Sequence, residues 1–157
     1  MNMAYFDKCK KEGPCAGFID STPAAIISSC VISTWKPSHA KKNIDKMLKA
    51  CDFLVGLDSD GDGIIELPFS GNSMDAEYPH KGARPRIWWD NFACGHKDIF
   101  FNCLSHRALR GTEKLARKLG RIDGANKVAA FLEKMNKNFF DTFYNPETGV
   151  MAGWISA

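Results

Sequence analysis

Alternating carboxylates stand in the segment DSDGDGIIE, residues 58–66, where Asp58, Asp60 and Asp62 are each separated by one residue. Carboxylate oxygens are the ligands that calcium prefers, and the ion takes roughly six to eight oxygens. The first half of an EF-hand loop places acidic residues at this same spacing. The segment therefore predicts either a calcium-binding loop or a turn that uses Asp and Gly for their backbone geometry alone.

The second half of the segment matches the EF-hand pattern only in part. If Asp58 takes the first position, the backbone carbonyl of Ile64 and the carboxylate of Glu66 fall at two further ligand positions. Phe69 falls where an EF-hand has its bidentate glutamate. We therefore expect no full EF-hand, and Glu66 is a candidate for contacting a substrate as well as a metal.

An aromatic and acidic cluster follows at Trp88, Trp89, Asp90 and Asn91, with Arg86 just before it. Sugars present flat apolar faces and many hydroxyl groups, so aromatic platforms beside carboxylates and polar donors suit them. Glycoside cleavage needs one carboxylic acid to protonate the leaving oxygen and a second carboxylate to activate water or attack carbon. Asp90 is a candidate acid because the two indoles would desolvate it and raise its pKa.

Structural roles compete with these assignments. A tryptophan pair before a helix also suits a hydrophobic core, and Asp90 is well placed to cap a helix. Asp75, in the loop at residues 70–75, is a second candidate acid, although a solvated loop residue would have the same sequence. His106 and Arg107 could line a site, and packing or surface roles explain them equally well.

Four stretches together resemble the six-hairpin, (α/α)6-barrel glycosidases, a superfamily that includes glucoamylases, trehalases and processing glucosidases. They are DSDGDGIIE at 58–66, IWWDNF at 87–92, LSHRALRGTEKLARKLGR at 104–121 and NPETGVMAGW at 145–154. The resemblance spans roughly residues 22–157 and rests on the order and spacing of these stretches.

The resemblance implies an all-α fold, in which helical hairpins form part of an (α/α)6 toroid with long structured loops. It implies that Asp90 is the general acid and that Trp89 stacks on a sugar. In trehalase-like members the acid follows a Ser-Gly motif, which would favour Asp75. The remaining substrate-binding candidates are Glu66, Arg86, Trp88, Asn91 and Trp154.

The chain departs from the family pattern in its number of hairpins. The family's barrel has twelve helices, whereas this sequence predicts about four, and the second catalytic carboxylate has no counterpart. We therefore expect residues 1–157 to be a single partial domain of an O-glycosyl hydrolase acting on a glucoside-type carbohydrate substrate. Exposed barrel faces would then favour self-association. The alternatives are a non-catalytic carbohydrate- or calcium-binding helical module and a purely structural helical protein.

Several helices must position these residues. Residues 1–20 are expected to be irregular, and Ser21 or Thr22 can cap a largely apolar helix that we expect to be well buried. Apolar spacing predicts a helix over residues 39–56 that ends at Gly56, followed by a long loop over 57–90.

The second half of the chain predicts two more helices. One runs from Asn91 or Asp98 to Leu119, and the other from Gly124 to Tyr144. Residues 145–149 predict a turn, and residues 150–155 a short strand or an irregular edge.

Composition limits the partners. Hydrophobic residues make up 45% and charged residues 25% of the chain, which is typical of a globular protein. The net charge of +3 is spread along the chain, which argues against nucleic-acid binding.

No apolar stretch is long enough for a membrane helix, and the N-terminal residues lack the apolar core of a signal peptide. With no CxxC pair among the six cysteines, we expect reduced thiols and a cytoplasmic location.

Overall fold

The computed structural model describes residues 20–66 and 96–155, and these residues are mostly helical. The helices are α2 (Ser21–Trp35), α3 (Pro37–Val55), α4 (Ile99–Lys118) and α5 (Ile122–Phe143). Four two-residue strands accompany them: β1 (Lys97–Asp98), β2 (Tyr144–Asn145), β3 (Val150–Met151) and β4 (Trp154–Ile155). The all-α expectation is confirmed for the described residues.

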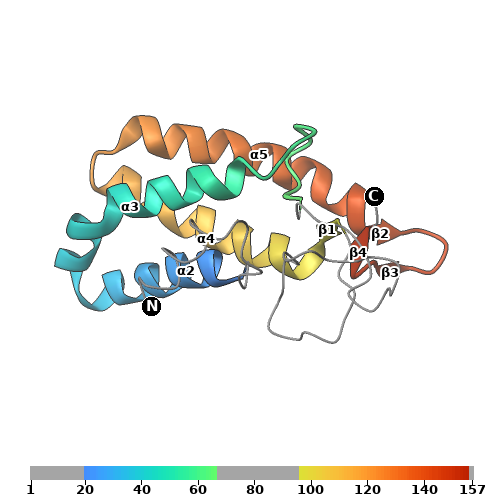
Figure 1. Ribbon diagram of the computed structural model, residues 1–157, viewed down its shortest axis with the longest axis horizontal. Helices are drawn as coiled ribbons and strands as arrows, with labels where there is room; N and C mark the ends of the chain where they lie inside the picture. Colours follow the sequence, from blue (N-terminus) through green and yellow to red (C-terminus); the bar gives the residue numbers. More distant parts are fainter. Residues whose placement is uncertain (1–19, 67–95, 156–157) are drawn as a thin grey trace, which may run out of the picture.

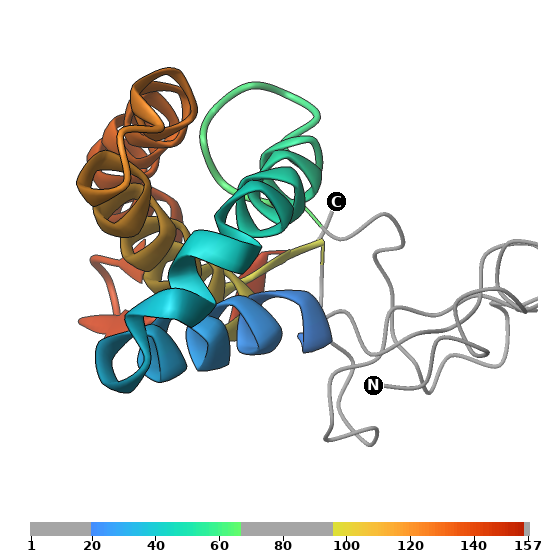
Figure 2. The same cartoon turned by 90° about the vertical axis from the view of Figure 1, so that its left-hand side faces the viewer.

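Two antiparallel hairpins form the bundle, because short connections join α2 to α3 and α4 to α5 (Figure 1). Helices α2 and α4 run in the same direction and pack against each other. Gly111 in α4 permits this approach, since a Cβ atom there would lie 2.8 Å from the Sγ atom of Cys30. In the end-on view, α2 lies at one edge of the bundle and contacts α3 and α4 (Figure 2).

The core follows the apolar spacing of the sequence. Helix α3 buries Ile44, Met47, Cys51 and Leu54, which recur at intervals of three and four residues. These side chains meet apolar residues of α4 and α5. None of the helices in the described ranges combines the length and the apolar character that crossing a membrane requires.

Helix boundaries agree closely with the sequence pattern. Helix α3 begins at Pro37 and is followed by Gly56. Of the two predicted starts for α4, the later one is correct: the Asp98 side chain caps the helix by accepting a hydrogen bond from Phe101 N at 2.6 Å. Gly120 ends α4 with a left-handed backbone, φ +73°.

Helix α2 differs from the prediction. We expected it to be well buried because its residues are apolar on nearly every side, but only Pro23, Ile26 and Ser33 are buried. Its outer side is exposed, with Trp35 87% accessible. Apolar composition indicates a preference for burial, whereas actual burial depends on which elements are present to cover the helix.

The short strands gather at one end of the bundle (Figure 1). Strands β1 and β4 pair in antiparallel register, with Lys97 opposite Ile155 and Asp98 opposite Trp154. Strands β2 and β3 form a hairpin whose turn is residues 146–149, one residue shorter than the predicted turn at 145–149, with Gly149 at φ +71°. Residues 150–155, for which the sequence predicted a short strand or an irregular edge, contain the two short strands β3 and β4.

Candidate functional site at the loop end of the bundle

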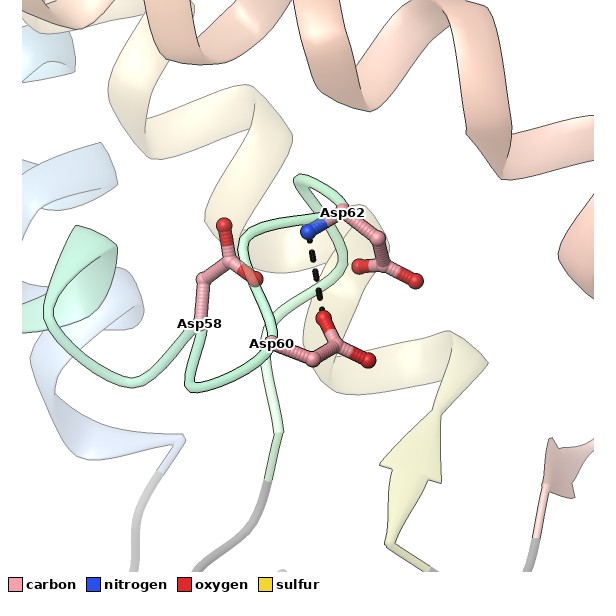
Figure 3. A group of neighbouring side chains, drawn as sticks. All are labelled: Asp58, Asp60 and Asp62. Atoms are coloured by element: carbon pink, nitrogen blue, oxygen red, sulfur yellow. Dashed lines mark hydrogen bonds between the residues drawn. The ribbon is translucent and has the colours of Figure 1, made fainter.

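The acidic segment forms a tight loop directly after α3, and its own side chains organise it. Asp58 accepts backbone hydrogen bonds from Gly61 N at 3.0 Å and Gly63 N at 3.1 Å. Asp60 accepts another from Asp62 N at 3.1 Å (Figure 3). Each aspartate therefore bonds a backbone N–H of its own loop, which is the turn geometry that the Asp and Gly residues predict.

The same loop brings three carboxylates together. One oxygen from each of Asp58, Asp60 and Asp62 lies within 4.8 Å of the other two, so the group could hold a metal ion (Figure 3). Burial raises the pKa of Asp58 above its ordinary value. A cation near these oxygens would therefore be favourable.

Lys97 supplies a cation from the protein itself. Its Nζ atom lies 2.8 Å from Asp60 Oδ2, 2.6 Å from Asp62 Oδ2 and 3.6 Å from Glu66 Oε1. The lysine side chain is only 11% exposed. Burial alone would lower the pKa of Lys97, but the hydrogen bonds to the aspartates raise it above its usual value. The hydrogen bond from Lys97 in turn lowers the pKa of Asp60 to about 2.

Glu66 takes part in a different set of contacts. Its Oε2 atom accepts hydrogen bonds from the backbone N–H and the hydroxyl of Ser59, and its Oε1 atom lies 3.0 Å from His96 Nε2. Burial opposes ionisation, yet the hydrogen bonds from Ser59 hold the pKa of Glu66 below its ordinary value. Glu66 therefore joins the end of the acidic loop to the residue that precedes β1.

Two helices fix the backbone of the loop. Buried Asn102 in α4 donates to Ile65 O at 2.9 Å and accepts from Ile65 N at 2.8 Å. Asn138 in α5 donates to Asp62 O at 2.6 Å. Gly63 packs so closely on α5 that a Cβ atom would lie 2.7 Å from Lys134 Cβ. The loop is thus held by contacts far away in sequence as well as by its own carboxylates.

Trp154 belongs to β4, which pairs with β1, the strand that contains Lys97. It is opposite Asp98 in the ladder, and its neighbour Gly153 accepts a hydrogen bond from Ile99 N at 3.0 Å. The tryptophan is 43% exposed. Of the predicted substrate-binding residues, the structure describes Glu66, which contacts His96 just before β1, and Trp154, whose strand β4 pairs with β1 (Figure 1).

The remaining predicted site residues lie outside the described residues. They are Asp75, Arg86, Trp88, Trp89, Asp90 and Asn91. The predicted metal ligand Ile64 is fully buried, and its N–H donates to Asp62 Oδ1 at 2.7 Å. His106 hydrogen-bonds Asn136 Oδ1 at 2.9 Å, away from the acidic loop.

Sequence reasoning missed the partners that hold the loop, namely Ser59, Lys97, Asn102 and Asn138. Of these four residues, only Lys97 could have been found from the sequence. It is a cation one residue before Asp98, which caps α4. Comparisons of the chain with protein-family models, curated proteins and solved structures found no match. The function must therefore be argued from the residues themselves.

Proposed function

We propose that the chain is part of the catalytic domain of a glycoside hydrolase, acting on a glucoside-type substrate at the loop end of the bundle. The observation that carries the proposal is the contact between Glu66 and His96. These two residues bound segment 67–95, which contains the candidate acids Asp75 and Asp90. Because they meet, the two described residues that flank this segment in the sequence lie at one place on the bundle.

Two residues of types that suit a carbohydrate site occur in the described ranges. Trp154 offers a partly exposed indole on the strand that pairs with β1, and Glu66 contacts His96 just before β1. Aromatic faces beside hydrogen-bonding carboxylates are the elements of a sugar site. The described residues are mostly helical, which is the fold class that the resemblance implies. In this proposal either Asp90 or Asp75 protonates the leaving oxygen.

Hydrolysis of glucosides with different leaving groups tests the proposal. A disaccharide needs protonation of its leaving oxygen, whereas a p-nitrophenyl glucoside has a good leaving group and needs it much less. In the chain reconstituted with the part of the domain that supplies the second carboxylate, replacing the acid, by Asp90→Asn or Asp75→Asn, should lower turnover of the disaccharide by roughly 10²- to 10⁴-fold. The aryl glucoside should be affected less. Asp123→Asn, on the exposed start of α5, is the matched control.

Binding gives a second readout that does not depend on turnover. A cationic iminosugar of gluco configuration imitates the charge of the oxocarbenium-like transition state, so it should bind the wild-type chain and lose affinity in the variant of the acid. Calorimetric titration measures both. Absence of iminosugar binding together with absence of hydrolysis would contradict the proposal and favour a non-catalytic module.

A calcium-binding role for the acidic loop is the second candidate. The observation in its favour is the proximity of oxygens from Asp58, Asp60 and Asp62. Calcium would compete with the Lys97 ammonium, which already contacts two of these carboxylates. Bound calcium should stabilise the fold by about 2.7 kcal/mol at a free concentration of 100 Kd.

Thermal unfolding in calcium, in magnesium and in a chelator tests this role. A rise in Tm that calcium causes and that Asp58→Asn abolishes would support it. The same Tm in all three conditions would show that the loop is a turn without a metal.

A further inference from the structure

Helix α2 presents a continuous uncharged surface to solvent. None of its fifteen residues is charged. We define the α2 face as its exposed stripe: Ala24, Ala25, Ser28, Val31, Ile32 and Trp35. Val31 is 49% and Ile32 45% exposed, while the buried residues of the helix lie on the opposite side. Exposed apolar patches of this kind commonly mark a surface that another molecule covers.

Charge favours a second copy of this chain as the covering molecule. The chain carries a net charge of +3, and the other long helices expose lysines, such as Lys41 and Lys42 on α3 and Lys134 and Lys137 on α5. Two copies that met through α3 or α5 would bring these like charges together. The α2 face has none, so two copies can approach through it without this repulsion.

The ends of α2 carry opposite charges. Asp20 precedes the helix and Lys36 follows it, and Ser28 lies midway between them in the sequence. If two copies of α2 pack antiparallel about a two-fold axis at Ser28, Asp20 of each copy lies opposite Lys36 of the other. Antiparallel packing also places the helix dipoles in their favourable relative orientation.

Side-chain sizes are complementary in the same register. Ala24 of one copy comes opposite Ile32 of the other, and Ala25 comes opposite Val31. Small residues thus face large ones, and the small side chain of Ser28 permits close approach at the axis. Charge, size and exposure therefore all agree with one arrangement of two copies.

We propose that the α2 face is the interface of a two-fold-symmetric homodimer, in which α2 packs antiparallel against α2 of the second copy with Ser28 at the axis. The interface is isologous, so each contact occurs twice. It uses the edge of the bundle that α3 and α4 leave uncovered (Figure 2). The proposal does not depend on the catalytic role proposed above.

Sedimentation velocity of the full chain tests whether the dimer exists and where its interface lies. The wild type should sediment with twice the 17.5 kDa mass of the chain. Ile32→Asp places a carboxylate in the interface twice and should weaken the dimer by at least about 100-fold. Phe140→Asp, at a side chain on α5 that is 55% exposed, is the matched control and should remain dimeric.

Either of two results would overturn the proposal. One is a wild type that stays monomeric up to its highest soluble concentration. The other is a dimer that survives Ile32→Asp, whatever the effect of Phe140→Asp. Circular dichroism confirms that each variant is folded, and both substitutions are at exposed positions that the fold can accept.

Cysteine cross-linking tests the antiparallel register. Ser28→Cys should form a disulfide-linked dimer under mild oxidation, above the level that the native cysteines give in the wild type. Ala24→Cys should not, because a rise of about 1.5 Å per residue separates the two introduced thiols by about 12 Å. Cross-linking at both positions would indicate a parallel pair and overturn the register, and cross-linking at neither would overturn the interface.

Discussion

Asn102 forms two hydrogen bonds with the backbone of Ile65, donating to its carbonyl at 2.9 Å and accepting from its N–H at 2.8 Å. One side-chain amide thereby satisfies both backbone groups of a fully buried residue. The same Nδ2 atom also donates to Asp98 O at 2.9 Å. Asn102 therefore joins the acidic loop, β1 and α4 at the base of the candidate site.

Replacing Asn102 should consequently be costly. Asn102→Ala leaves the N–H and the carbonyl of Ile65 buried without their partner, and each unsatisfied group costs about 1–3 kcal/mol. We expect the free energy of unfolding to fall by roughly 2–4 kcal/mol, measured by urea denaturation. The control is Asn126→Ala, at an exposed amide on α5, which should change stability by about 0.5 kcal/mol or less. Equal effects of the two substitutions would argue against a stabilising role for the hydrogen bonds between Asn102 and Ile65.

Two glycines of the acidic loop provide a matched pair. Gly63 has φ +86°, and a Cβ atom there would lie 2.8 Å from Met135 N. Gly61 has φ +78°, but no atom lies within 4 Å of its Cβ position. Gly61→Ala should cost only the strain of the left-handed backbone, about 1–2 kcal/mol. Gly63→Ala adds a steric clash with α5 backbone and should destabilise by at least about 1 kcal/mol more.

Chemical denaturation of both alanine variants measures this difference. Because the backbone strain is common to the two sites, subtracting one from the other isolates the packing of the loop on α5. If Gly63→Ala proved no worse than Gly61→Ala, the close contact of the loop with Lys134 and Met135 would be refuted.

The acidic loop and the helices were predictable to different degrees. The spacing of Asp58, Asp60 and Asp62 is local, so the sequence alone indicated a carboxylate-rich turn. The buried stripe of α3 was predictable for the same reason. The partners of the loop were not, because Lys97 and Asn102 are more than thirty residues away in the chain.

Burial was harder to predict than helix formation. Helix α2 was expected to be well buried, because its residues are apolar on nearly every side. The structure buries the side that contains Ile26 and leaves Val31 and Ile32 exposed. A single sequence reports which residues favour burial, but the presence of a covering element depends on tertiary and quaternary contacts.

Because of Lys97, the stability that the acidic loop contributes to the fold should depend on pH. The hydrogen bond from Lys97, together with the backbone hydrogen bond from Asp62, lowers the pKa of Asp60 from 3.8 to about 2. A carboxylate whose folded pKa is depressed contributes stability that is present above its unfolded pKa, near 3.8, and is lost as the pH falls towards 2. Lys97→Met removes the largest cause of the depressed pKa, so the Tm of the variant should fall less steeply than that of the wild type between about pH 4 and pH 2.

An exposed ion pair provides the control for this measurement. Lys127 pairs with Asp52 at 2.6 Å, and both side chains are more than half exposed. Such surface pairs contribute about 0–1 kcal/mol, so Lys127→Met should leave the pH profile of Tm close to that of the wild type. Identical profiles for Lys97→Met and the wild type would show that Lys97 does not stabilise the ionised loop.

Trp154 should separate substrate binding from stability. It is 43% exposed and belongs to a two-residue strand, so Trp154→Ala removes an aromatic face while leaving the β1–β4 backbone pairing in place. If the indole stacks on a sugar, the binding free energy of the iminosugar should weaken by roughly 1–2 kcal/mol, which raises its Kd about 5- to 30-fold. Trp35→Ala, at an 87% exposed tryptophan on α2, should leave that affinity unchanged. Calorimetric titration measures the iminosugar affinity of both variants. Equal losses of affinity would indicate a general effect on the fold. No loss in Trp154→Ala would show that this residue is not part of the site.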